Sequence, residues 1–573
     1  MTVTDTRPSA HTPALVAEVE PSLAQYPGLA GWLSTGDHKT VGRLFVVLGL
    51  LGGIFSLVVG ALVGFERADV TGIDLLPDLE TLHQQAAMYR VGLVFLFALP
   101  LIVGLAMYVV PLQVGSPSIA FPRLALASFW TWLVGGGIFI ASVFADGGLG
   151  RPASGATMGG SEQEAVELTL LALGLVVIAA LAATLCIVTT IVALRPSGMG
   201  LTRVPLFSWS MLVSGGMWLL TLPVLVANIA IIWVDLRGVT ALAYGQPANI
   251  YAQLSWVFDQ PQIFAFALPV LGIVGDIIPV AFGQRQRLYG VLQFAIGALG
   301  FLSFGAFANR YFNPNVTDEV LFVVMGLLLL VPTLVFLGGM ADTARRGGRP
   351  AFSSQLVLGA MALLLFIGGV VVAVLRVLGP AVGVVREADK DWLSGFIDPL
   401  EDLQGTSIIS GHLHLVLLTA ALGAIAGLYH WGPKVWGRRP SAVAGIAGGM
   451  ALVGAIVLTS VPDIVSGFLD QPELALAPGD YAGVTEQSTV EAMNTLGAIG
   501  MVLGVVGLLL VLLDVLVGGA LGRGREAGDD PWGGHTLEWA TSSPPPLGNF
   551  AAPVAPVTSE APLIDPADDG GAA

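Results

Sequence analysis

Charged residues are scarce in this sequence, and it contains a single cysteine. Only 11% of its 573 residues are charged and 55% are hydrophobic, whereas soluble globular proteins carry roughly a quarter charged residues. Such scarcity indicates that most of the chain lies in hydrocarbon, where each ionisable group is costly. One cysteine, Cys186, excludes a disulfide framework or a cysteine metal site within the chain. Residues 1–41 are polar and lead into a full-length apolar run, so no cleavable signal peptide is expected.

Twelve apolar runs are long enough to cross a bilayer, which takes about twenty residues. They lie at roughly 42–65, 86–112, 124–146, 167–194, 206–234, 261–282, 290–308, 319–340, 352–377, 407–431, 441–464 and 491–518. The pattern predicts an all-α integral membrane protein with a twelve-helix membrane domain over 42–518. We expect residues 1–41 to form an N-terminal segment, and the Pro/Ala/Asp-rich residues 519–573 to form a largely disordered tail.

The basic residues indicate how the bundle is oriented. An even number of spans places both termini on one side of the membrane. On that side lie the Lys/Arg-rich segments around Arg345 and Arg438, whereas segments 378–406 and 465–490 on the other side are rich in Asp and Glu. Because Lys and Arg favour the inner side, both termini are expected to be cytoplasmic. We expect the chain to be surrounded by membrane lipid. The absence of a basic groove argues against a nucleic-acid partner.

Two histidines lie two positions apart inside one predicted helix. At about 100° per residue, His412 and His414 point roughly 200° apart. They therefore cannot bind one metal ion together, but each could ligate a different group. Two polar residues hydrogen-bonded to neighbouring helices would have the same spacing, and the spacing alone leaves both interpretations open.

Several motifs resemble those of haem–copper oxidase subunit I. They are SGHLH at 410–414, GLYHWGPK at 427–434, GDHK at 36–39, VPLQVG at 110–115 and TLEWATSSPPP at 536–546. The resemblance implies the twelve-helix fold, cytochrome c oxidase-type electron transfer with haem, and partner subunits of a respiratory complex in a bacterial plasma membrane. It also implies that His412 ligates the oxygen-binding haem and His414 the low-spin haem.

The sequence departs from this family at the positions of the copper ligands. The three copper histidines of the family fall on Gln260, Asn309 and Arg310. Copper(II) prefers imidazole nitrogens, and an arginine guanidinium is permanently protonated and has no lone pair to offer. Copper is therefore not expected, and copper-dependent oxygen reduction by this chain is predicted to be lost.

Further departures affect the haem ligands and the proton carriers of the family. The second low-spin haem ligand falls on Tyr89, the proton-handling glutamate on Gln262 and the crosslinked tyrosine on Phe264. His412 and His414 remain candidate haem ligands, and Tyr89 is a further candidate.

A polar cluster is predicted where the family holds copper. It comprises Asp259, Gln260, Asn309 and Arg310, with an ion pair between Asp259 and Arg310, because either charge alone would be costly in hydrocarbon. The alternative is that Asp259 and Arg310 reach water separately at the outer surface.

Three functions therefore stay open. The chain could be a subunit I homologue in a respiratory complex that retains haem, or a non-catalytic scaffold or regulatory paralogue of a terminal oxidase. It could also be a transporter or channel that reuses the emptied cavity.

Overall fold

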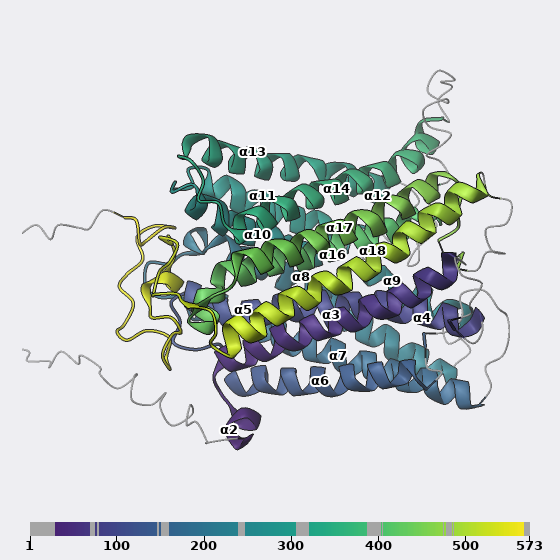
Figure 1. Cartoon of the computed structure of the whole chain (residues 1–573), viewed down its shortest axis with the longest axis horizontal. Helices are drawn as coiled ribbons and strands as arrows, with labels where there is room; N and C mark the ends of the chain where they lie inside the picture. The colour runs from purple at the N-terminus through teal and green to yellow at the C-terminus, as the bar shows by residue number, and fades with distance from the viewer. Residues whose placement is uncertain are drawn as a thin grey trace, which may run out of the picture.

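The structure is a bundle of long helices that run along one axis (Figure 1). The computed structural model describes residues 29–68, 75–76, 79–145, 148–149, 160–238, 247–304, 320–386, 403, 405–473, 475–476, 484 and 486–565. Within these residues, eleven helices are long and apolar enough to cross a membrane, and a shorter apolar helix, Tyr289–Ser303, occupies the seventh predicted span. Each of the twelve predicted runs therefore contains a helix, and the predicted all-α membrane fold is confirmed.

Several of the long helices are built from shorter elements joined end to end. The helices of the bundle are α3 (His38–Ala68), α4 (Leu79–Gly92), η2 (Leu93–Ala98), α5 (Leu99–Gln113), α6 (Pro122–Val143), α7 (Gly160–Ala193), α8 (Leu206–Leu236), α10 (Phe264–Ala281), α11 (Tyr289–Ser303), α12 (Val320–Leu328), α13 (Leu330–Arg346), α14 (Ser354–Arg386), α16 (Ile408–Trp436), α17 (Ala442–Phe468), α18 (Gln487–Asp514) and η8 (Val515–Ala520). Thus α4, η2 and α5 make one continuous span, with η2 as a π-helical turn in it. Short elements lie outside the bundle: α2 (Leu29–Ser34), η3 (Leu201–Arg203), α9 (Pro247–Ser255), η4 (Trp256–Phe258), η9 (Leu537–Ala540), β1 (Arg438–Arg439) and β2 (Arg525–Glu526).

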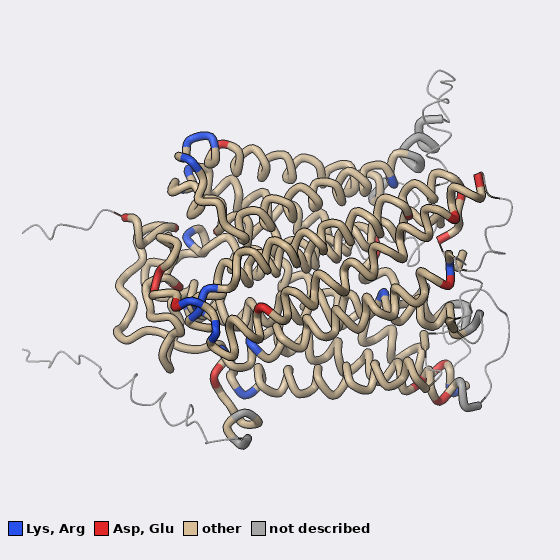
Figure 2. The backbone as a smooth tube through the Cα atoms, in the orientation of Figure 1, with Lys and Arg blue, Asp and Glu red and all other residues tan. Residues whose placement is uncertain are grey.

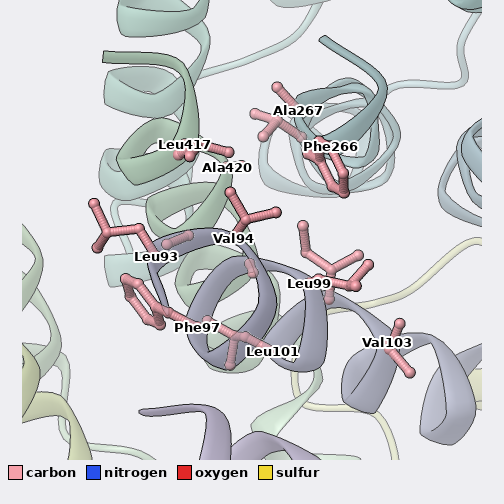
Figure 3. Close-up of a cluster of buried hydrophobic side chains, with 14 of the residues drawn as sticks. Leu93, Val94, Phe97, Leu99, Leu101, Val103, Phe266, Ala267, Leu417 and Ala420 are labelled. Carbon is pink, nitrogen blue, oxygen red and sulfur yellow. The ribbon is translucent and has the colours of Figure 1, made fainter. Parts of the chain in front are cut away.

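Two spans form the centre of the bundle. The most apolar window of the α4–η2–α5 span is completely buried, and that of α16 is 94% buried, whereas those of α6 and α8 are 39% buried. Figure 3 shows the core between them, where Leu93 and Val94 of η2 face Leu417 and Ala420 of α16. A polar side chain on α16 therefore has to find its partners inside the protein.

Glycines allow α3 to approach α5 closely. A Cβ atom on Gly42 would lie 2.6 Å from the carbonyl oxygen of Gly104, and a Cβ on Gly104 would lie 2.8 Å from that of Gly42. Small residues at such a crossing let two helix backbones pack directly, which stabilises helix association in a membrane.

Both described chain ends, near Leu29 and Asp565, lie at the same end of the bundle, which we call the terminal end (Figure 1). Lys and Arg residues gather at this end, around the tips of α13 and α16 (Figure 2). At the opposite end lie the C-terminal ends of α3 and α17 and the N-terminal ends of α16 and α18 (Figure 1).

The expectation of a largely disordered tail is wrong for residues 519–565. This segment packs as an irregular cap on the terminal end, and β2 within it pairs with β1. Asn549 is fully buried; its side chain donates to the carbonyl oxygen of Ser116 at 2.8 Å and accepts from the Lys39 ammonium at 3.1 Å. The Pro-rich composition gave no regular helix, but buried polar contacts of this kind hold the segment in place.

Candidate functional site

The candidate site is built around the first turns of α16, whose two histidines contact different helices. His412 is 1% exposed and its ring faces α14 and α10, whereas His414 is 2% exposed and its ring faces α4 and α17. Two positions on one helix therefore serve two separate groups of side chains, in agreement with their angular separation.

Both ring nitrogens of His412 have protein partners. Nε2 lies 3.1 Å from the carbonyl oxygen of Gly369, and Nδ1 lies 3.2 Å from the Arg376 guanidinium. A carbonyl only accepts and a guanidinium only donates, so the neutral ring carries its proton on Nε2 and accepts from Arg376 at Nδ1. Phe264 packs against the ring with a centroid distance of 5.6 Å.

The same arginine forms an ion pair with Asp259. Arg376 donates to Oδ1 of Asp259 at 3.0 Å, and the backbone N–H of Gln260 donates to the same oxygen at 2.7 Å. The Gln260 amide donates to the carbonyl oxygen of Ala373 at 3.0 Å. Sequence reasoning missed Arg376, although a lone arginine within the apolar run 352–377 was a signal for a buried charge that needs a partner.

Two members of the predicted polar cluster, Asn309 and Arg310, lie outside the described residues. The ion pair between Asp259 and Arg310 therefore stays a prediction. Arg376 is a partner of Asp259 that the sequence analysis did not anticipate.

His414 lies between a hydroxyl and a carboxylate. Its Nε2 is 3.3 Å from the Tyr89 hydroxyl, and its Nδ1 is 3.3 Å from Oδ2 of Asp463. The other oxygen of Asp463 accepts from Arg67 at 2.9 Å. Because a carboxylate only accepts, the neutral ring carries its proton on Nδ1 and accepts from Tyr89 at Nε2. The sequence analysis missed Asp463 and Arg67; Asp463 is a lone acid in its apolar run, which was the available signal.

A third charged group lies next to Tyr89 along α4. The guanidinium of Arg90 donates to Glu473 at 3.0 Å, to the hydroxyl of Ser410 at 2.7 Å and to the hydroxyl of Tyr251 at 3.3 Å. Burial raises the pKa of Glu473, although Arg90 beside it acts in the opposite direction. Burial likewise raises the pKa of Tyr251 to about 12.

Three buried ion pairs thus lie together near the opposite end of the bundle. Each joins a basic residue of one helix to an acid from a distant part of the chain: Arg67 with Asp463, Arg90 with Glu473, and Arg376 with Asp259. Pairing offsets the large desolvation cost of each charge. These ion pairs therefore form a polar layer around both histidines in which the charges balance one another.

The described residues do not fit a haem at either histidine. An axial ligand must offer the lone pair of a ring nitrogen to the iron, but in His412 this lone pair faces Arg376 and in His414 it faces Tyr89. Tyr89 and His414 contact each other directly, with their rings stacked at a centroid distance of 6.0 Å. The cavity beside them measures about 30 Å³, which is room for a water molecule and far less than a porphyrin needs.

Gln262 and Phe264 hold an amide and an aromatic ring at the positions that the resemblance assigns to the proton-handling glutamate and the crosslinked tyrosine. The Gln262 amide donates to the Thr221 hydroxyl at 3.3 Å, and Phe264 packs against Phe366 with a centroid distance of 5.8 Å. Among the residues that the structure describes, no three His, Cys, Asp or Glu side chains are grouped closely enough to hold a metal ion. The chemistry that these side chains offer is hydrogen bonding and charge pairing.

Comparison with known proteins identifies the family. The family model described as cytochrome C and quinol oxidase polypeptide I matches residues 40–381 and 401–512. The chain is 29% identical to a putative cytochrome c oxidase subunit 1-beta of Streptomyces avermitilis, over 96% of this chain and 94% of that protein. It is also 29% identical to cytochrome c oxidase subunit 1 of Corynebacterium efficiens, over 95% of this chain and 91% of the relative. The chain is thus a multi-pass membrane protein that belongs to the family of cytochrome c and quinol oxidase polypeptide I.

Proposed function

We propose that this chain is a non-catalytic subunit I paralogue that assembles with a respiratory oxidase complex in a bacterial plasma membrane. Members of its family generally bind haem and work within such complexes. Bacterial relatives cover nearly its whole length. Under this proposal, the chain retains the membrane fold of the family but does not carry out copper-dependent oxygen reduction.

The contact between Arg376 and His412 is the observation that carries the proposal. A guanidinium donates to the ring nitrogen that would face a metal, and it is held there by Asp259. A permanent positive charge at this point repels a metal cation. Gln260, at a family copper position, donates its amide N–H to the carbonyl oxygen of Ala373.

The resemblance to the family implies haem at His412 and His414, but the geometry around both rings favours a chain without it. Tyr89, the further candidate ligand, uses its hydroxyl to contact His414 at 3.3 Å. We therefore propose that both histidines act as hydrogen-bonding residues that join α16 to its neighbours.

The distribution of charge supports cytoplasmic termini. Lys and Arg gather at the terminal end of the bundle (Figure 2), and basic residues prefer the inner side of a membrane.

Optical spectra and metal analysis of the purified full-length chain test the loss of redox chemistry. We expect reduced-minus-oxidised spectra without haem bands and less than stoichiometric copper and iron. Stoichiometric copper with haem iron would overturn the proposal. Haem without copper would overturn only the proposed absence of haem. The Arg376→Met variant, purified in the same way, tests whether the guanidinium is what keeps a metal or haem from His412.

Assembly is tested in the host membrane. A tagged chain should co-migrate with a catalytically active oxidase on native gels, and deletion of its gene should lower the amount of that assembled oxidase. Free migration of the chain, with unchanged oxidase after deletion, would contradict a scaffold role.

A further inference from the structure

A small cavity beside His414 is lined by buried polar groups that lack partners. It measures about 30 Å³ and lies among α3, α4, α16, α17 and α18. Asn494 of α18 lines it, is 5% exposed, and has no hydrogen bond to either polar atom of its side chain. Arg90 of α4 also lines it, and its Nε likewise has no hydrogen-bond partner.

Orphaned polar groups of this kind indicate a ligand. A buried donor or acceptor without a partner costs about 1–3 kcal/mol, and more when it is charged. Two such groups, from helices far apart in the sequence, line one cavity of molecular size. A bound species that accepts from both would remove this cost.

Donors outnumber acceptors in the lining. Arg90 offers Nε–H and Asn494 offers its amide N–H groups, whereas both oxygens of Asp463 are already engaged by Arg67 and His414. The other side-chain atoms in the lining without a hydrogen bond include Oδ1 of Asn494 and Nδ1 of His414, which lies 3.3 Å from Asp463. Donors to a charged partner form the stronger hydrogen bonds.

The charge around the cavity also favours an anion. Arg67 and Arg90 line it with one carboxylate, Asp463. Glu473 pairs with Arg90 from outside the lining. The lining itself therefore holds two guanidinium groups and one carboxylate.

We propose that this cavity binds a small monovalent anion, such as chloride, between the Arg90 guanidinium and the Asn494 amide. Its volume admits a single ion of about the size of water and excludes carboxylates and phosphates. The site does not depend on the absence of copper or on assembly with an oxidase.

Thermal unfolding of the full chain in detergent tests the proposal. Sodium gluconate is replaced stepwise by sodium chloride or bromide at constant ionic strength. We expect the unfolding temperature to rise with halide and to saturate, because a ligand that binds only the folded state stabilises it. The Asn494→Leu variant should lose about tenfold or more in halide affinity, which corresponds to one lost hydrogen bond to a charge. The matched control Asn228→Leu, on α8 and outside the cavity, should keep the response.

Crystals of the wild-type chain grown in bromide give a second measurement that needs no variant. An anomalous peak beside Arg90 and Asn494 would support the site. A peak-free cavity that holds only water, a wild-type chain indifferent to halide, or equal halide responses of wild type and Asn494→Leu would each overturn the proposal.

Discussion

Arg376 contacts both a carboxylate and a histidine ring in the interior of the bundle. It donates to Asp259 and to His412, and its side chain is 1% exposed. Removal of one partner from a buried pair leaves the other charge uncompensated, and this is worse than never having had the pair.

The Arg376→Met variant should therefore lose about 3 kcal/mol of unfolding free energy, measured by denaturant titration in detergent. The Asp259→Asn and Arg376→Met double variant should lose less than the sum of the two single variants, with a coupling energy of about 1 kcal/mol or more. Additive losses would show that the pair contributes nothing. The same cycle with Asp259 and Arg310 tests the ion pair predicted from sequence.

Asp463 and Tyr89 flank the same ring but should differ in importance. Asp463→Asn removes the carboxylate that pairs with Arg67 and should cost about 3 kcal/mol. Tyr89→Phe removes one neutral hydrogen bond of 3.3 Å and should cost about 1 kcal/mol. Denaturant titration compares the two variants, and a larger loss for Tyr89→Phe would contradict the proposed order.

At the scale of elements, the α3–α5 crossing depends on the direct contact of two backbones. Gly104→Leu would place a side chain against the Gly42 carbonyl and should cost about 2–3 kcal/mol through overpacking. Gly137→Leu on α6 is the matched control, because a Cβ there meets nothing within 4 Å, and it should change stability by less than about 0.5 kcal/mol. Thermal unfolding of both variants checks the difference. Equal effects would show that α3 and α5 can move apart without cost.

The helices were predictable from the sequence, whereas most ion pairs were not. A run of about twenty apolar residues in hydrocarbon forms a helix, because only a helix satisfies all its backbone hydrogen bonds within the segment. Hydropathy therefore located every span. The partner of a buried charge, by contrast, comes from a distant helix: Arg67 and Asp463 are 396 positions apart. A lone charge in an apolar run, such as Arg376 or Asp463, signals that a partner is needed, but the sequence does not say which. The partners Asp259 and Arg67 are known only from the packing of the helices.

At the scale of the whole molecule, the tail is part of the folded protein. Glu538 of η9 is fully buried and accepts from Gln113 of α5 and Trp431 of α16, each at 3.1 Å. The high content of Pro and Ala suggested disorder, because amino-acid composition carries no information about individual buried contacts. The cap therefore joins helices that the sequence keeps more than three hundred residues apart.

The attachment of the tail should depend on pH. Burial raises the pKa of Glu538 in the folded state, so its ionised form destabilises the fold. Stability should rise as the pH falls through the folded pKa toward the unfolded value. Limited proteolysis of the tail should become slower over this range. Glu538→Gln, which keeps a carbonyl acceptor for both donors, should flatten the dependence, and an unchanged profile would contradict this role of Glu538.

The place of Asn549 has a consequence for biosynthesis. This residue ties Lys39, at the start of the first span, to Ser116, just beyond the second. This edge of the first hairpin is thus covered only after Asn549 has been synthesised. An affinity tag or fusion partner is best joined beyond Asp565, because a chain cut before Asn549 would leave the edge open.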